Sequence, residues 1–105
     1  MEENALQMDL SPPMAEKVIR KVARDSGRVF FTMHAETRMR ERGINRTQVL
    51  RCLRLGRVVE GPARDTHGKW IATLEVLSAG DVVTVVAALD NDDTGNLVVV
   101  ITVYR

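Results

Sequence analysis

Residues 82–104 read VVTVVAALDNDDTGNLVVVITVY, two long apolar runs on either side of a short polar segment. Val, Ile and Thr are enriched in strands, whereas Asp, Asn and Gly are typical of tight turns. The stretch therefore predicts a β-hairpin with strands over 82–89 and 97–104. Both runs are apolar at nearly every position, which is typical of central strands or of strands covered by helices.

Two further runs with strand character precede this hairpin, over 57–60 and 69–77. In the second run Trp70, Ala72 and Leu74 alternate with other residues as on a half-buried strand, which predicts that the indole of Trp70 fills the core. Turn residues separate all four runs, and short turns favour antiparallel pairing. The second half of the chain is therefore predicted to be a four-stranded antiparallel meander.

Helical periodicity dominates before residue 57. Ser11 and Pro12 are typical of a helix start, and the pattern predicts helices over 12–26, 33–42 and 46–55. Asn45 and Gln48 stand at capping-box spacing before the third helix. Residues 29–31 are either a short strand or an extended link. The predicted fold is α+β, with N-terminal helices packed on one face of the sheet; residues 11–105 form a single domain and 1–10 a loose arm.

Composition excludes several classes of protein. The apolar runs of this 105-residue chain are too short to cross a bilayer, and the acidic N-terminus lacks the features of a signal peptide, so we expect a cytoplasmic protein without a membrane partner. The single cysteine, Cys52, has no base beside it and is predicted to be a packed thiol. Residues 90–96 begin like a calcium loop, but the twelfth position is Ile101, so an acidic turn is predicted. We expect no cofactor and no metal.

Charge is distributed unevenly along the chain. Residues 17–57 hold twelve Lys/Arg and three Asp/Glu, a net charge of +9, whereas the remainder holds three against eleven, a net charge of −8. Such a basic block favours an anionic partner, either nucleic acid or an acidic protein. Three helices with solvated cationic faces would give the same count.

The second predicted helix, MHAETRMRERG over 33–43, places His34, Arg38 and Arg42 four residues apart. They follow one edge of the helix, between a core face with Ala35 and Met39 and the solvent. Metal-free cleavage of RNA needs a base, cations at the phosphate and an acid; histidine supplies the first or last, and arginine the second. The alternative is that the arginines pair with nearby carboxylates and the histidine merely sits near the helix start.

The segment H-A-E-T-R-M-R-E-R-G-I, residues 34–44, resembles the H-A-x-x-R-M-x-x-R-G-I signature of an uncharacterised family of small bacterial domains. A G-x-W step at 68–70 and a closing I-T-V-Y strand at 101–104 resemble the same family. The resemblance covers about residues 30–105. The order of helices and meander also resembles the RelE/barnase-type RNase toxins of toxin–antitoxin loci.

These resemblances imply a metal-independent endoribonuclease toxin that acts on RNA, free or on the ribosome, and is neutralised by an antitoxin or other protein partner. They imply His34 as acid or base and Arg38 and Arg42 as phosphate ligands. Lys69 would contact phosphate, and Tyr104 would stack on a base or donate a proton. The alternative is a non-catalytic module that binds nucleic acid or protein through its basic helices, with strands 82–89 and 97–103 supporting a homodimer.

Overall fold

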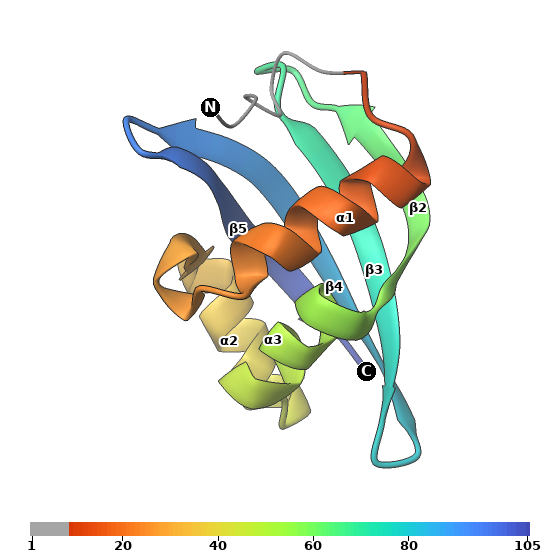
Figure 1. The fold of residues 1–105 in the computed structure, drawn as a ribbon. Coiled ribbons are helices and arrows are strands. Elements are labelled where there is room, and N and C mark those ends of the chain that lie inside the picture. Colours follow the sequence, from red (N-terminus) through yellow and green to blue (C-terminus); the bar gives the residue numbers. More distant parts are fainter. Residues whose placement is uncertain (1–8) are drawn as a thin grey trace.

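The computed structural model describes residues 9–105, which form three α-helices, a short 3-10 helix and a five-stranded sheet (Figure 1). The helices are α1 (Pro12–Ala23), α2 (Met33–Arg42) and α3 (Arg46–Leu55), with the 3-10 helix η2 (Ser26–Arg28) after α1. The strands are β1 (Val29–Phe31), β2 (Arg57–Arg64), β3 (Trp70–Ser78), β4 (Asp81–Asp92) and β5 (Gly95–Tyr104).

The sheet confirms the predicted meander and adds a strand to it. Its order is β1-β5-β4-β3-β2, and the four later strands pair antiparallel with their neighbours. The prediction of an all-antiparallel four-stranded sheet was wrong, because β1 pairs parallel to β5, with Val29 opposite Val98 and Phe31 opposite Val100. A three-residue strand is too short to show a periodic pattern, and its partner lies far along the chain.

Strand β2 runs past the predicted end at residue 60. Residues 61–64 were predicted to be a turn because of the Gly-Pro pair, yet Ala63 and Arg64 pair with β3. The register shifts twice in this strand, and the Gly61–Pro62 peptide bond is cis. Proline is tolerated here because β2 is an edge strand.

Helix α1 ends at Ala23, three residues before the predicted end. The side chain of Asp25 accepts a hydrogen bond from the backbone N–H of Gly27 and starts η2, which leads the chain into β1. Helices α2 and α3 match their predicted ranges. In α3 the amide side chains of Asn45 and Gln48 each accept a hydrogen bond from the other's backbone N–H, at 2.8 and 2.9 Å, so the capping box is confirmed.

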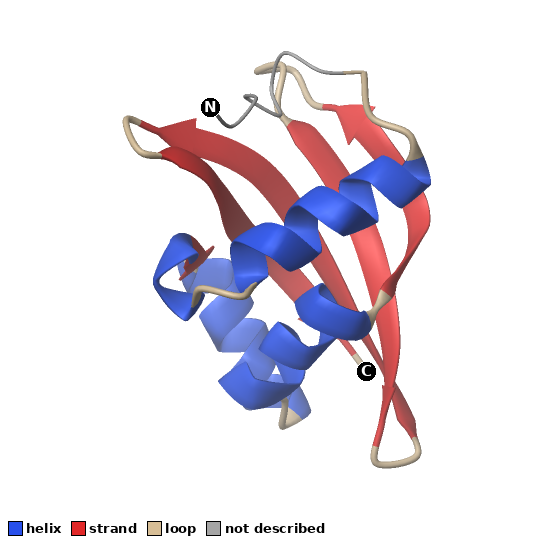
Figure 2. Cartoon of the chain, viewed as in Figure 1, coloured by secondary structure: helices blue, strands red, loops and turns tan. Residues whose placement is uncertain are grey.

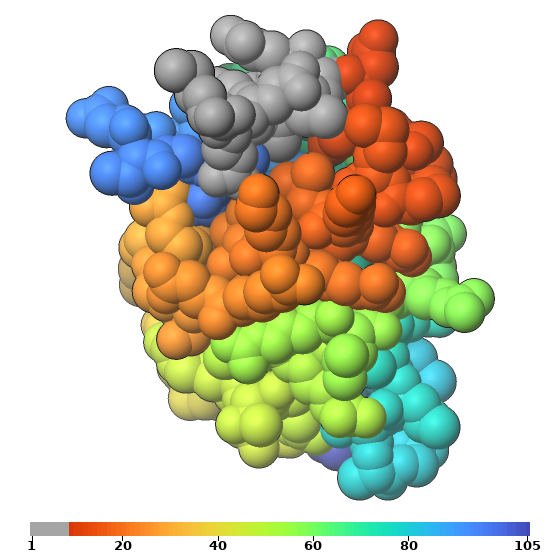
Figure 3. Space-filling model, in the orientation of Figure 1, coloured from red at the N-terminus to blue at the C-terminus, as the bar shows by residue number. Residues whose placement is uncertain are grey.

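The three helices lie on one side of the sheet, as Figure 2 shows. In the space-filling view α1 and α3 hide most of the sheet, whereas the turn between β3 and β4 reaches beyond them (Figure 3). The core lies between the two layers and includes Ile19 and Leu53 from the helices and Leu74, Val85 and Val100 from the central strands. The α+β prediction with helices on one face is confirmed at this level.

The other face of the sheet is here called the open face. Side chains alternate along a strand, so the residues between two buried positions point to the open face. Thr84, for example, lies between Val83 and Val85, which are fully buried. Cross-strand pairing assigns to the open face Phe30, Ile71, Thr73, Glu75, Leu77, Val82, Thr84, Val86, Ala88, Asp90, Leu97, Val99, Thr102 and Tyr104.

The arm predicted for residues 1–10 lies outside the described residues except for Asp9 and Leu10, and Leu10 is buried in the core.

Candidate functional site

Helix α2 is fixed at its start to strand β5. The hydroxyl of Thr32 caps the helix by accepting from the backbone N–H of Ala35 at 3.0 Å, and it also donates to the carbonyl oxygen of Ile101 at 3.0 Å. The Thr32 backbone N–H donates to Val100 O at 3.1 Å. One residue therefore ends β1, begins α2 and holds both to β5.

The far end of α2 is held to the end of the same strand. Gly43 ends the helix in the left-handed conformation, at φ 64°. The guanidinium of Arg105, the residue after β5, donates to the carbonyl oxygens of Arg42 and Gly43 at 2.9 and 3.1 Å. Because β1 pairs only with residues 98–100 of β5, α2 occupies the edge of the sheet beside the rest of that strand.

The side chains of His34, Arg38 and Arg42, here called the α2 flank, lie together as the spacing predicted. Arg42 places its guanidinium 5.3 Å from the centroid of the Tyr104 ring. Tyr104 pairs with Thr84 and therefore belongs to the open face. Residues four apart follow one another along a helix, so Arg38 and His34 continue the row that begins with Arg42, while Ala35 and Met39 are buried in the core.

The three flank residues differ in their partners. Arg38 forms an ion pair with Glu41, with Nη1 to Oε1 at 2.6 Å. His34 is exposed, and within residues 9–105 no hydrogen bond or ion pair holds its imidazole. The alternative that the arginines pair with carboxylates therefore holds for Arg38, whose partner lies on the same helix. Arg42 instead contacts an aromatic ring. Both arginines keep part of their surface open to solvent.

Lys69 does not join this site. Its ammonium donates to the Asp90 carboxylate at 2.8 Å, and this hydrogen bond raises the pKa of Lys69 and lowers that of Asp90. Asp90 stands six residues after Thr84, the partner of Tyr104, so about 20 Å of strand separates the two places. Lys69 and Tyr104 were both predicted to bind substrate, because the sequence does not show which end of the sheet each residue reaches.

The β2–β3 region also carries an indole and an imidazole, those of Trp70 and His67. Trp70 packs against the core as predicted, and the guanidinium of Arg64 lies 4.1 Å from its ring centroid. His67 lies in the turn before β3, where its backbone N–H donates to the Asp65 carboxylate at 2.8 Å. That acceptor also binds the backbone N–H of Lys69 at 2.9 Å, and these contacts lower the pKa of Asp65.

Several arginines of the basic block hold the fold together. Arg20 donates at 3.3 Å to the carbonyl oxygen of Gly56, the residue that follows α3. Arg54 donates at 2.7 Å to the carbonyl oxygen of Ala23, the last residue of α1. Arg46 pairs with Glu36 at 3.3 Å and lies over the Phe31 ring at 4.3 Å. The +9 charge of residues 17–57 is therefore an upper limit on the cations available to a partner.

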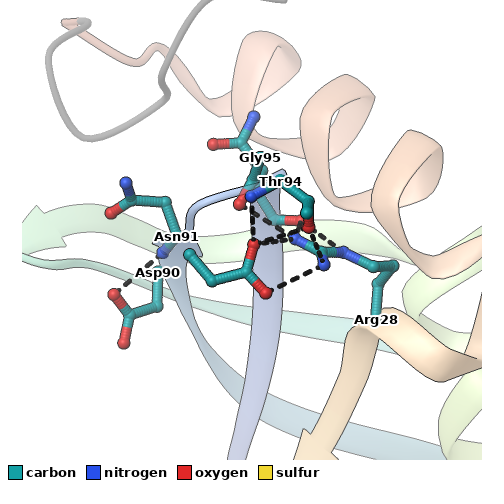
Figure 4. A network of polar contacts seen from close by, with 7 residues as sticks. Arg28, Asp90, Asn91, Thr94 and Gly95 are labelled. Atoms are coloured by element: carbon teal, nitrogen blue, oxygen red, sulfur yellow. Dashed lines mark hydrogen bonds and ion pairs between the residues drawn. The ribbon is translucent and has the colours of Figure 1, made fainter.

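The acidic segment predicted as a turn over 90–96 turns only at residues 93–94, beside an arginine (Figure 4), because residues 90–92 of β4 pair with residues 95–97 of β5. Arg28 donates to both carboxylate oxygens of Asp92 at 2.9 and 3.0 Å, and to the carbonyl oxygens of Gly95 and Asn96. The guanidinium, together with the Thr94 hydroxyl and N–H, holds the pKa of the Asp92 carboxyl well below its usual range. Within residues 9–105, no group of three or more His, Cys, Asp or Glu side chains could hold a metal ion.

Phe30 was not among the site residues predicted from the sequence. Phe30 pairs with Val99 on β5 and points to the open face, where 49% of its surface is exposed. A signal was present, because alternation in Val29-Phe30-Phe31 predicts that the middle ring faces away from its neighbours. Without the pairing to β5, however, nothing placed that ring on the same sheet face as Tyr104.

The fold and the α2 flank define a small α+β protein in which a helix with a cationic flank borders a sheet face that no helix of residues 9–105 covers. The chain belongs to the family described as Domain of unknown function (DUF4258), which matches residues 31–105. The matched range contains α2, α3 and the whole meander but not α1, so the predicted membership in an uncharacterised domain family is confirmed. Neither a curated protein nor a solved structure matches the chain. No helix among the described residues is long and apolar enough to cross a membrane.

Proposed function

We propose that this protein is a metal-independent endoribonuclease of the toxin type, with the α2 flank and Tyr104 as its site. The observation that carries the proposal is the placement of one imidazole and two guanidinium groups along the flank, with Arg42 5.3 Å from the Tyr104 ring. An imidazole supplies proton transfer near neutral pH, guanidinium groups bind phosphate oxygens, and an exposed ring stacks on a base.

The proposed reaction is attack by the RNA's own 2′-hydroxyl on the adjacent phosphate. His34 takes the proton of that hydroxyl, the 2′-oxygen bonds to phosphorus, and the bond from phosphorus to the 5′-oxygen breaks. Arg38, one helical turn away, stabilises the charge on the phosphate oxygens. His34 and Arg42 are two turns apart, about 12 Å, so Arg42 and Tyr104 hold a neighbouring nucleotide and water protonates the leaving oxygen.

The toxin role rests on the resemblance of helices followed by a meander to RelE/barnase-type toxins. Such a role implies a cytoplasmic site of action, RNA that is free or ribosome-bound, and a protein partner that neutralises the activity. One fold can serve many unrelated functions, so the chemical test on the α2 flank decides the proposal.

Cleavage of a labelled single-stranded RNA pool by the purified protein, with EDTA present, tests this proposal. We expect His34→Ala to lower the rate at least about 100-fold and Arg38→Ala to lower it by a similar factor. The matched controls are His67→Ala in the β2–β3 turn and Arg40→Ala on the opposite side of α2, which should both cleave like the unmodified chain. Full activity of His34→Ala, with RNA cleaved by the unmodified chain, would overturn the assignment.

A second candidate function is a nucleic-acid-binding module without catalysis. It is favoured by one observation: no side chain among residues 9–105 orients the His34 imidazole, whereas catalytic histidines are usually held by a second group. In this case the unmodified chain binds RNA and leaves it intact, and His34→Ala binds about as tightly. The homodimer predicted from the apolar strands stays a prediction, which sedimentation of the free chain would test.

A further inference from the structure

Two large aromatic rings on the open face are exposed to solvent. Phe30 keeps 49% of its surface exposed and Tyr104 keeps 44%. Each ring leaves an apolar area in water, and burying that area against a partner would be favourable. Phe30 lies one residue before the range that the family match covers.

On β5 and β4 the open-face positions between the two rings carry no charged side chain, and on β3 the exposed Glu75 lies across Thr84 from Tyr104. Phe30 pairs with Val99, and Tyr104 lies five positions further along β5, a span of about 17 Å. Val86 and Thr102 face each other across β4 and β5 between these points. The nearest acidic side chain of β4 on this face is Asp90, which is already paired with Lys69.

The α2 flank borders this strip from Ile101 onwards, whereas β1 borders it at Val99. The helix begins beside Ile101, where the Thr32 hydroxyl donates to the carbonyl oxygen, and it ends beside Arg105. Arg42 contacts Tyr104 directly. The molecule thus presents a row of cations on one side and aromatic and aliphatic side chains on the other, an arrangement that complements a strand with a charged backbone and apolar bases.

We propose that the open face between Phe30 and Tyr104 is a platform for unpaired bases, which makes the substrate single-stranded RNA. This inference rests on the proposed function. Phosphates follow the α2 flank, and bases turn inward to stack on Phe30 and Tyr104. A duplex cannot bind in this way because its bases are stacked inside the helix and present no free face to a ring.

Binding of a fluorescent single-stranded RNA dodecamer, and of the same strand annealed to its complement, tests the platform by anisotropy. All variants carry His34→Ala so that the RNA stays intact. We expect the single strand to bind at least about tenfold more tightly than the duplex, and Phe30→Ala and Tyr104→Ala each to weaken it about tenfold. Tyr104→Phe keeps the ring and should bind as before. Leu77→Ala, which removes an apolar side chain that is 63% exposed on β3, outside the strip between Phe30 and Tyr104, is the matched control.

The outcomes separate the platform from the proposed function. Selective single-strand binding that falls in both alanine variants and survives Tyr104→Phe and Leu77→Ala supports the platform. Equal affinity for both RNAs, or unchanged binding by Phe30→Ala and Tyr104→Ala with native circular dichroism, overturns the platform and leaves the proposed function standing. No binding of either RNA by the chain with an intact His34 removes the proposed function and the platform with it.

Discussion

Cys52 is a buried thiol whose environment makes it inert. Its side chain is fully buried in α3, with Sγ 3.7 Å from the carbonyl oxygen of Val83, and burial raises the pKa of the thiol to about 12. The thiolate is the reactive form, so both access and ionisation are suppressed in the native state. The structure thus confirms the packed thiol that the sequence predicted.

We therefore predict that Cys52 reacts with an aromatic disulfide reagent at pH 8 at least about a thousandfold more slowly in the native protein than in 6 M urea. The rate is followed by the absorbance of the released thiolate. The native rate should rise with added denaturant in step with unfolding. Rapid labelling without denaturant would show that the α3–sheet contact opens freely.

Gly56 is required because two backbones approach each other there. A Cβ at this position would lie 2.4 Å from the carbonyl oxygen of Cys52 and 2.7 Å from that of Glu75. The backbone conformation of Gly56 is ordinary, at φ −73° and ψ 169°, so the restriction is space and not torsion. Neither carbonyl can move without displacing the end of α3 or strand β3.

Gly56→Ala should consequently lower the free energy of unfolding by about 2–3 kcal/mol, as overpacking between fixed elements does. Urea denaturation followed by circular dichroism measures the change. Gly27→Ala is the control: there a Cβ would be 3.1 Å from the flexible Asp25 carboxylate, which can turn away. Equal small losses in both variants would mean that α3 slides easily against the sheet.

Among the elements, those with local signals were predicted and those with distant partners were not. The capping pair Asn45 and Gln48 and the turn before Gly95 lie within a few residues of the elements they define. Strand β1 and the second half of β2 are defined by hydrogen bonds to β5 and β3, which no local pattern specifies. A Gly-Pro pair is typical of turns, but on an edge strand it is also compatible with pairing.

Arg28 connects η2 to the β4–β5 turn. Its guanidinium binds the Asp92 carboxylate, the Thr94 hydroxyl and the carbonyl oxygens of Gly95 and Asn96. Removal of the side chain leaves partly buried acceptors without a donor, so Arg28→Ala should cost about 2 kcal/mol in the free energy of unfolding. Urea denaturation at pH 7 checks this, with Arg24→Ala at the exposed end of α1 as the control. An identical loss in both variants would show that the connection contributes nothing.

The same contact makes stability depend on pH in a stated direction. The pKa of Asp92 is held below its usual range, first by the Arg28 hydrogen bond and then by Thr94. Between the two pKa values the unfolded chain binds more protons, so the contribution is present above the ordinary pKa of about 3.9 and is lost as pH falls from there towards the folded value. Asp65 and Asp90, whose pKa values are also lowered, add to the same slope.

We expect the free energy of unfolding to fall between pH 5 and pH 2.5, and to fall less steeply in Asp92→Asn. Urea denaturation at four pH values in this interval gives both slopes. Asp93→Asn, beside Asp92 in the same turn, is the control and should keep the slope of the unmodified chain. Parallel curves for Asp92→Asn and the unmodified chain would exclude the Arg28–Asp92 contact as a source of the pH dependence.

For the whole molecule, the candidate site divides into a part that periodicity predicts and a part that needs the tertiary fold. The four-residue spacing was enough to place His34, Arg38 and Arg42 on one flank. It did not show that Tyr104 contacts that flank, that Phe30 lies on the same sheet face as Tyr104, or that Lys69 lies at the other end of the sheet. Net charge also overstates the surface available for binding, since Arg20, Arg28 and Arg54 donate to backbone carbonyls inside the fold.

The salt dependence of RNA binding counts the cations that touch phosphate. For a single strand, each neutralised phosphate contributes about −0.7 to the slope of log K against log salt concentration. Arg38→Ala and Arg42→Ala should each reduce the steepness by about 0.7, whereas Arg40→Ala, on the other side of α2, should lower neither the slope nor the affinity. Anisotropy titrations of a single-stranded dodecamer between about 50 and 200 mM salt give the three slopes, with the His34→Ala background common to all. If Arg40→Ala changed the slope as much as Arg38→Ala, the positive charge of the whole helix would attract the RNA. The proposal that the α2 flank binds phosphates at defined positions would then be wrong.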